Sequence, residues 1–331
     1  MSSVAAARAP ADVGSACRRC GWRDWLRAFA LAALPSAGIA QAPPVLPVAI
    51  APDVYLAQGV AALGSGANRN FISNAAFVVT REGVVVIDAL GAPVLAEELL
   101  AAIARITALP VKTVIVTHYH ADHIYGLQAF KARGATIVAH RLAQAYLHSD
   151  TAALRLLASR TELAPWIDAD TRLVAADRWI EGAERFTLGG VEFVLQPAGP
   201  AHTAEDLAVF LPASRTLFAG DLVFRNRVPF VGQADSGRWV EALDRLLALA
   251  PRVIVPGHGP ASSDAVQDLQ LTRDYLVHLR QAMGEAARNL EPFEDAYARA
   301  DWSRFSHLPL FQAANRINAY NTYLLMEQQA K

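Results

Sequence analysis

A run of apolar and β-branched residues, VKTVIV at 111–116, passes directly into the polar sequence THYHADH. The run has the length and composition of a buried strand. Four potential metal ligands follow within six positions: His118, His120, Asp122 and His123. Polar side chains gathered there are costly without a shared partner, and neutral imidazole with carboxylate suits zinc and related borderline metals. The motif therefore predicts a metal site at the end of this strand, against the alternative of a solvated loop that happens to carry histidines.

Three further polar residues close strand-like runs in the same manner: His202 after LQPAGPA, Asp221 in TLFAGD and His258 in VIVPGHG. Each alone is weak evidence, because a single histidine after a strand is more often a surface residue or one with a structural partner. Together with the first motif they supply five histidines and two aspartates, enough for two zinc ions with open coordination positions. The remaining histidines lack this setting and are interpreted as structural: His140, His148, His278 and His307.

Short β-branched runs alternate with helical patterns from about residue 53 to residue 260. The expected strands are 75–80, 83–88, 111–117, 135–140, 191–196, 207–212, 216–221 and 252–259. The expected helices are 93–109, 124–134, much of 141–160, about 238–249 and most of the chain after Pro260. The first helix should bury one face: Val94, Leu95, Leu99, Ile103 and Ile106. This alternation in two halves predicts an α/β fold of two packed sheets with helices outside.

The first forty residues have the order of a secretory signal peptide. Four arginines between positions 18 and 27 precede the apolar stretch AFALAAL, and small residues follow it. The stretch is shorter than the roughly 20 residues that a spanning helix needs, which disfavours an N-terminal membrane anchor. We therefore expect cleavage after Ala40, export to the periplasm by the Sec or the twin-arginine route, and no stable membrane association afterwards.

Cysteine usage and charge limit the possible metal ligands and the class of substrate. Both cysteines, Cys17 and Cys20, fall in the segment predicted to be removed, so the mature chain should contain neither a thiol nor a disulfide. Any metal must then be held by histidine and carboxylate. Lys and Arg number 30 against 31 Asp and Glu, with no block of like charge, so we expect a small-molecule substrate and no nucleic acid.

The quoted motifs resemble those of the metallo-β-lactamase superfamily. HxHxDH at 118–123, AHTAED with His202, AGD with Asp221 and PGHG with His258 match in order and over nearly the whole predicted mature chain. The resemblance implies an αββα sandwich with the metals at one edge of the two sheets. It also implies a catalytic domain at 41–260 and a C-terminal helical extension at 261–331 packed on the same domain.

The same resemblance implies the role of each ligand. The first zinc ion would be held by His118, His120 and His202, and the second by Asp122, His123 and His258. Asp221 would bridge the two ions, and Asp88 would support the ligands from behind. Asp122 and Asp221 would act as the catalytic residues that hold and orient a shared hydroxide. The implied activity is hydrolysis of an ester, a thioester or a lactam.

Within the superfamily the pattern is mixed. The zinc β-lactamases of the cysteine-ligand subclass have Cys where this chain has Asp221, and Lys where it has Phe224, unless Arg225 or Arg227 takes the place of that lysine. Asp221 is the pattern of hydroxyacylglutathione hydrolases, but the tail shows no obvious basic glutathione-binding cluster. The signal peptide, GPAHT, GDLVF, PGHGP and the tail sequence NAYNTYLLME look like the exported metallohydrolases found with periplasmic quinoprotein and sulfur-oxidation systems.

Two other functions stay open at this point. One is a mononuclear iron enzyme similar to persulfide dioxygenases, with His118, His202 and Asp221 as its facial triad. The other is a non-catalytic protein that kept a structural metal. Two glycine- or arginine-containing loops, 63–71 and 224–233, are expected to lie near the metals and to decide the substrate, and Tyr125 to narrow the entrance.

Overall fold

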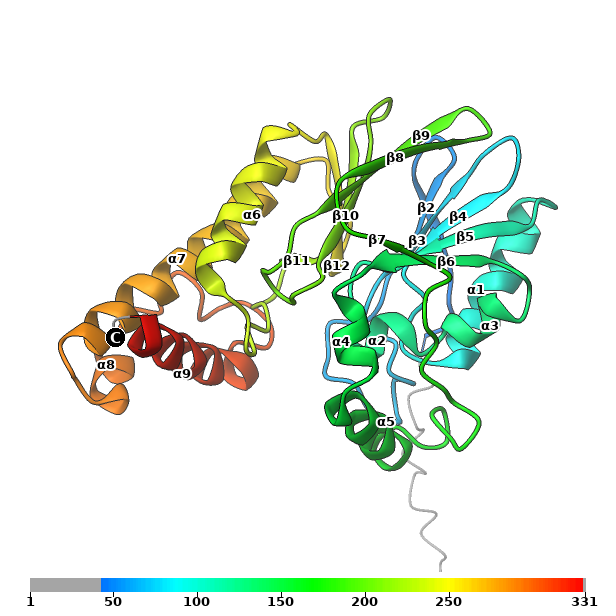
Figure 1. Ribbon diagram of the computed structural model, residues 1–331. Coiled ribbons are helices and arrows are strands. Elements are labelled where there is room, and N and C mark those ends of the chain that lie inside the picture. The colour runs from blue at the N-terminus through cyan, green and yellow to red at the C-terminus, as the bar shows by residue number, and fades with distance from the viewer. Residues whose placement is uncertain (1–42, 330–331) are drawn as a thin grey trace, which may run out of the picture. The chain divides into compact units, whose positions relative to one another are not determined.

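Two β-sheets form the centre of the computed structural model, which describes residues 43–329 (Figure 1). The predicted signal peptide, with both cysteines, lies outside the described residues. Within the described part, the first sheet has seven strands in sequence order: β1 (Val48–Ala51), β2 (Val54–Ala57), β3 (Ala75–Val79), β4 (Val84–Ile87), β5 (Val111–Ile115), β6 (Thr136–His140) and β7 (Arg178–Ile180). Neighbours are antiparallel from β1 to β4 and parallel from β4 to β7.

The second sheet has five strands in residues 43–329, in the order β12-β11-β10-β9-β8. Their bounds are β8 (Glu184–Leu188), β9 (Val191–Pro197), β10 (Leu207–Leu211), β11 (Thr216–Phe224) and β12 (Val253–His258). The pair β11–β12 is parallel and the other pairs are antiparallel. β5 and β12 are each paired in parallel with a neighbouring strand, so the loops that follow their carboxyl ends can lie at one edge of the sandwich.

The described range contains nine helices. They are α1 (Pro93–Ile106), α2 (Ala121–Ile124), α3 (Leu127–Lys131), α4 (Ala143–Leu147), α5 (Asp150–Glu162), α6 (Ser236–Ala248), α7 (Ala265–Arg288), α8 (Phe293–Arg299) and α9 (Phe311–Gln329). Figure 1 shows α1 and α3 on the outer side of the first sheet and α6 and α7 on the outer side of the second. The predicted αββα sandwich with a helical C-terminal region is confirmed.

Three apolar clusters correspond to these layers. The cluster between the sheets contains residues from both, among them Val85, Ile115, Val209 and Phe218, all at most 1% exposed. A second cluster joins the first sheet to α1 and α3, and a third joins the second sheet to α6, α7 and α9. The C-terminal helices therefore share an apolar core with the second sheet. None of the helices within 43–329 is long and apolar enough to cross a membrane.

Several local predictions differ from the structure. The helix expected at 124–134 is two short helices, α2 and α3, because the chain turns at Gly126, whose N–H donates to the carbonyl of Leu90 (3.2 Å). Strand β11 continues three residues past Asp221, to Phe224. Ile106, expected on the buried face of α1, is 40% exposed and is the last residue of the helix. Strands β1, β2, β7 and β8 were not predicted.

Candidate metal centre

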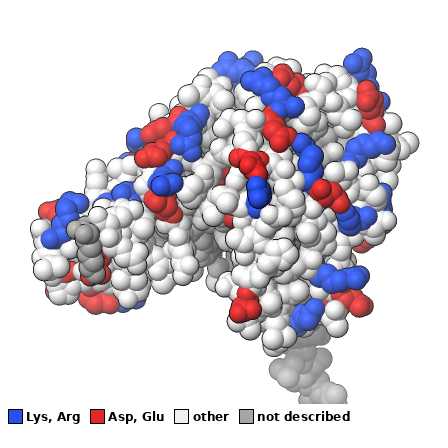
Figure 2. All heavy atoms as spheres, viewed as in Figure 1, with Lys and Arg blue, Asp and Glu red and all other residues white. Residues whose placement is uncertain are grey.

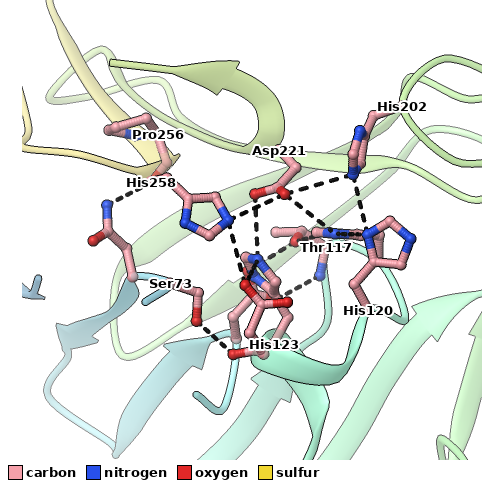
Figure 3. A network of polar contacts seen from close by, with 12 residues as sticks. Ser73, Thr117, His120, His123, His202, Asp221, Pro256 and His258 are labelled. Atoms are coloured by element: carbon pink, nitrogen blue, oxygen red, sulfur yellow. Dashed lines mark hydrogen bonds and ion pairs between the residues drawn. The ribbon is translucent and has the colours of Figure 1, made fainter. Parts of the chain in front are cut away.

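All seven predicted ligands lie together where four chain segments meet at one edge of the sandwich (Figure 3). The segment that follows β5 enters α2 and carries four of them: His118, His120, Asp122 and His123. His202 comes from the loop between β9 and β10, Asp221 from β11, and His258 from the last position of β12. The short helix α2 begins directly after His120, which turns Asp122 and His123 back toward the strand ends.

The first ligand group, His118, His120 and His202, presents three ring nitrogens to one point. His120 Nδ1 lies 3.1 Å from His118 Nε2 and 3.1 Å from His202 Nε2. His118 donates its Nδ1–H to the hydroxyl oxygen of Thr117 (3.1 Å), since that hydroxyl in turn donates to Asp88. The Nε2 of His118 therefore carries a lone pair that points into the site.

The second ligand group, Asp122, His123 and His258, faces the first. Asp122 Oδ2 lies 3.6 Å from His123 Nε2 and 3.3 Å from His258 Nε2. Both histidines are fixed through their other ring nitrogen. His123 donates from Nδ1 to Asp88 Oδ2 (2.9 Å), and His258 donates from Nδ1 to the carbonyl of Ile72 (2.7 Å). Each Nε2 is thus directed at the other ligands, which is the arrangement that metal-binding histidines require.

Asp221 lies between the two ligand groups. Its Oδ1 is 3.2 Å from His123 Nε2, and its Oδ2 is 3.3 Å from His258 Nε2, 3.5 Å from His202 Nε2 and 3.8 Å from His118 Nε2. One carboxylate therefore reaches nitrogens of both groups, as Figure 3 shows for His258 and His202 on either side of it. The neighbouring strand makes room for it, because a β-carbon at Gly257 would lie 1.9 Å from Asp221 Oδ1.

Asp88 binds the residues that carry the ligands without facing the cavity itself, the role that the family resemblance implied. Its Oδ1 accepts from the backbone N–H of Thr117 and its Oδ2 from the Thr117 hydroxyl, both at 2.8 Å, and it also accepts from His123. It is 2% exposed and has φ of 61°, a conformation that Asp adopts more readily than most residues. One buried carboxylate thereby sets the tautomer of one ligand directly and of His118 through Thr117.

The donor geometry fits a pair of borderline divalent ions. Lone pairs that face each other repel unless a cation lies between them, and the ring nitrogens of the first ligand group are 3.1 Å apart. Tetrahedral zinc with Zn–N bonds of 2.0–2.1 Å would need a nitrogen–nitrogen separation of about 3.3 Å. His123 Nε2 and Asp221 Oδ1 are buried without a hydrogen-bond partner in the described structure, although they lie 3.2 Å apart. A metal ion would satisfy both atoms.

Burial and charge set the protonation of the ligands. Burial, aided by the neighbouring histidines, lowers the pKa of His118 well below 6.5, and burial lowers the pKa of His202 to about 3. Burial alone would also lower the pKa of His123, but the carboxylates of Asp221, Asp122 and Asp88 raise it well above 6.5. Metal binding must therefore displace a proton from His123, whereas His118 and His202 are already neutral.

A cavity of about 400 Å³ opens beside the two ligand groups. His120, Asp122, Asp221 and His258 form its polar floor, and the segment after β11 forms one wall. Within that segment, Arg227 and Phe230 line the cavity, which agrees with the expected place of the 224–233 loop. An adjoining hollow shares His120 and Asp122 and runs toward α4 and α5, where Tyr146 and Arg155 line it.

The other predicted loop, 63–71, lies between β2 and β3; Leu63 within it and Ile72 directly after it line the cavity. Its far end is packed: Asn70 is 4% exposed and donates to the carbonyl of Gly91 (3.0 Å). Tyr125 does not narrow the entrance. It is 1% exposed, because its ring extends beneath α5 and its hydroxyl meets Ser159 Oγ at 3.2 Å.

The structure also adds residues that the sequence patterns did not reveal. Asn74 donates to the carbonyls of Pro256 (2.8 Å) and Gly259 (2.7 Å), and so fixes the strand end that carries His258. The hydroxyl of Ser73 donates to the carbonyl of Asp122. The only signal in the sequence is the polar pair directly before the buried strand β3. The four histidines interpreted as structural fall in no potential metal group of the described residues: His140, His148, His278 and His307.

Comparison with known proteins agrees with this geometry. The model of the metallo-beta-lactamase superfamily matches residues 68–258, which contain all seven ligands. The chain belongs to the metallo-beta-lactamase superfamily. It is 27% identical to the metallo-beta-lactamase IND-1 of Chryseobacterium indologenes over 195 residues, which are 57% of this chain and 73% of that protein. The chain is therefore an enzyme of a hydrolytic superfamily, as predicted.

Two solved structures support the fold. A metallo-beta-lactamase from Pontibacter korlensis superposes with a TM-score of 0.55 at 27% identity, over 70% of this chain and 98% of that one. The inverting sec-alkylsulfatase Pisa1 from Pseudomonas sp. superposes with a TM-score of 0.67 at 17% identity, over 85% of this chain and 50% of that one. The second match covers a larger share of this chain than residues 1–258 make up. The superposed part therefore includes some of the C-terminal helices as well as the superfamily fold.

Proposed function

We propose that this chain is a zinc-dependent hydrolase that cleaves an acyl bond, in an ester, a thioester or a lactam, at a dinuclear centre. One observation carries the proposal: the carboxylate of Asp221 lies within 3.2 to 3.8 Å of nitrogens from two separate and complete ligand groups. Buried imidazoles and carboxylates in this number suit two zinc ions that each keep an open position. A mononuclear iron site of His118, His202 and Asp221 would not account for the second ligand group, whose side chains also converge on one point.

The bound zinc ions would supply a water of lowered pKa and would polarise the scissile carbonyl. The protein then has to orient that water and the substrate. Asp122 is the carboxylate for the first task, because its side chain is 16% exposed toward the cavity, against 5% for Asp221. Its oxygen can accept the proton of the attacking water and return it to the leaving group. Asp221 is enclosed between the two ligand groups and would keep them at a fixed separation.

Arg227 indicates the charge of the substrate. Its side chain lines the cavity, is 2% exposed, and forms no ion pair with a carboxylate in residues 43–329. His258 is 3.3 Å away but cannot accept from it, because His258 Nδ1 already donates to Ile72. The carboxylates of Asp221 and Asp122 attract the guanidinium, but metal ions bound to them would offset this attraction, so the buried cation would need a further counter-charge. We infer that a substrate carboxylate or similar anion supplies it.

The alternative arginine from the sequence is engaged elsewhere. Arg225 Nε donates to both carboxylate oxygens of Asp268 on α7, at 3.0 and 3.1 Å. It does not line the cavity, although it lies only two residues from Arg227. The two arginines therefore form a matched pair for testing this part of the proposal.

Arg227→Gln should raise KM for a thioester that carries a free carboxylate by about tenfold to a hundredfold, the value of a hydrogen bond to a charged group. The methyl ester of the same thioester should be cleaved as by the wild type, since it offers no charge to Arg227. Steady-state kinetics on both substrates, with Arg225→Gln as the control, measure the difference. Equal effects of the two variants, or equal effects on the two substrates, would refute the anion-binding role.

We further propose that the protein works after export, in the periplasm, with a small-molecule substrate and without nucleic acid. The signal-like order of the first forty residues and the motifs typical of exported quinoprotein- and sulfur-oxidation-associated metallohydrolases support this. Basic and acidic side chains alternate over the face drawn in Figure 2, without the basic strip that a phosphodiester backbone would require. N-terminal sequencing of exported protein should give Gln41 first.

A further inference from the structure

The wall of the cavity that carries Arg227 is bound to the second sheet at its start, where the N–H of Arg225 donates to the carbonyl of His258 (3.0 Å), and to the C-terminal region farther along, where the N–H of Val228 donates to the carbonyl of Pro309 (3.1 Å) and helix α9 binds the residues after it. Residues 225–235, between β11 and α6, form no helix or strand, so their backbone groups need partners from elsewhere. The N–H of Val231 donates to Asn318 Oδ1 (2.9 Å), and Asn318 Nδ2 donates to the carbonyl of Pro229 (2.6 Å). One side-chain amide on α9 thus binds two backbone groups of the wall, 87 and 89 residues away in the sequence.

Asn318 is itself fixed by a buried polar chain. Its Nδ2 also donates to the Tyr275 hydroxyl (2.9 Å), which donates to Asn315 Oδ1 (2.9 Å), and Asn315 Nδ2 donates to the Tyr297 hydroxyl (3.2 Å). Asn315 and Asn318 are completely buried and Tyr275 is 1% exposed. Buried amides are tolerated when every polar group is paired, and such paired networks fix one arrangement of the elements that they join.

The segment that Asn318 holds is the one that shapes the cavity. Phe230 and Val231 line it, and the guanidinium of Arg227 lies between two rings, 5.4 Å from the centre of Phe224 and 5.1 Å from the centre of Phe230. Phe224 belongs to β11 and is fixed by the sheet, whereas Phe230 lies between the two residues that Asn318 binds. The second ring of this sandwich therefore takes its place from α9.

We propose that Asn318 is a positioning residue of the substrate cavity, which acts by holding Pro229 and Val231 so that Phe230 keeps Arg227 directed at the substrate anion. The C-terminal helices are then part of the specificity of the enzyme as well as of its core. This inference rests on the proposed function for its effect on catalysis. The anchoring of the backbone at Pro229 and Val231 by Asn318 stands on the hydrogen bonds alone.

Hydrogen exchange and kinetics on Asn318→Leu test the proposal. In peptides covering 228–233, the amide of Val231 should exchange at least about tenfold faster, since its N–H loses its acceptor. Metal content should be unchanged, and the preference for the free-carboxylate thioester over its methyl ester should fall about tenfold. Tyr297→Phe is the matched control: it removes one hydrogen bond from the outer end of the same network and should change neither quantity.

The double variant Asn318→Leu, Arg227→Gln separates positioning from general destabilisation. If Asn318 acts through Arg227, the double variant should prefer the free carboxylate no less than Arg227→Gln alone does. Additive losses, or unchanged exchange at 228–233, would overturn the proposal. Should Asn318→Leu fail to fold, Asn318→Asp keeps the size and the acceptor for Val231, and an unchanged preference in that folded variant would overturn it equally. If the wild type cleaves neither substrate, the proposed function fails, and the exchange data alone decide whether Asn318 holds the wall.

Discussion

Alanine at His120 should lower kcat/KM for the thioester by about a thousandfold or more, with the protein still folded. His120 Nδ1 is the ring nitrogen that lies within 3.1 Å of both other members of the first ligand group. Its loss removes one of the three ligands of the first metal ion. Polarisation of the substrate by that ion contributes several kcal/mol to transition-state stabilisation, and each loss of about 1.4 kcal/mol lowers the rate tenfold. The side chain is half-buried and precedes α2, so few core contacts are lost.

Asp122→Ala should have a similar effect for a different reason, because it removes both a ligand of the second group and the more exposed of the two carboxylates that line the cavity. Circular dichroism and thermal melting would show whether both variants keep the fold. His307→Ala is the control, since this exposed histidine belongs to neither ligand group. Hydrolysis within tenfold of the wild type in either ligand variant would exclude the two-group assignment.

Asp221→Cys should cost more thioester hydrolysis than β-lactam hydrolysis, by about tenfold or more. The carboxylate reaches His123 through Oδ1 and His258, His202 and His118 through Oδ2. A thiolate offers a single sulfur, which can ligate one ion at about 2.3 Å but cannot span both groups. We therefore expect part of the zinc to remain and the position of the shared water to change, toward the ligation of the cysteine-ligand lactamases.

Zinc content and rates with a thioester and a chromogenic cephalosporin, in the wild type and the variant, measure this effect. Asp221→Asn serves as the control, because it keeps the size of the side chain but removes the charge that two cations require. If Asp221→Cys lowers both activities equally at full zinc content, Asp221 does not set the preference between substrates. The preference would then depend on the 63–71 and 224–233 loops.

The ligands were predictable because local signals mark them. Each follows or ends an apolar run, and the carboxyl ends of such runs meet at one edge of the sandwich, so His202, Asp221 and His258 could be grouped with 118–123 before any contact was known. The grouping of Asp221 with both sets, by contrast, came from the resemblance. Its physical basis, the space left by Gly257, depends on the pairing of β11 with β12.

The unpredicted features depend on long-range contacts or on weak local signals. Strands β1, β2 and β7 have three or four residues each, and β8 alternates but includes charged residues. Asn74 acts on residues 182 and 185 positions away, and Asn318 on a segment nearly 90 positions away. An asparagine within an apolar pattern shows that a polar partner is needed, but not which backbone groups it will bind.

The number and identity of the bound metal ions test the central claim most directly. Protein purified without added metal, and again after reconstitution with zinc, can be analysed by inductively coupled plasma mass spectrometry alongside thioester hydrolysis. We predict about two zinc ions per chain, activity that a chelator removes and zinc restores, and about one ion per chain when the second ligand group is disabled by His258→Ala. One iron per chain with no hydrolysis would contradict the dinuclear hydrolase and favour the mononuclear oxygenase.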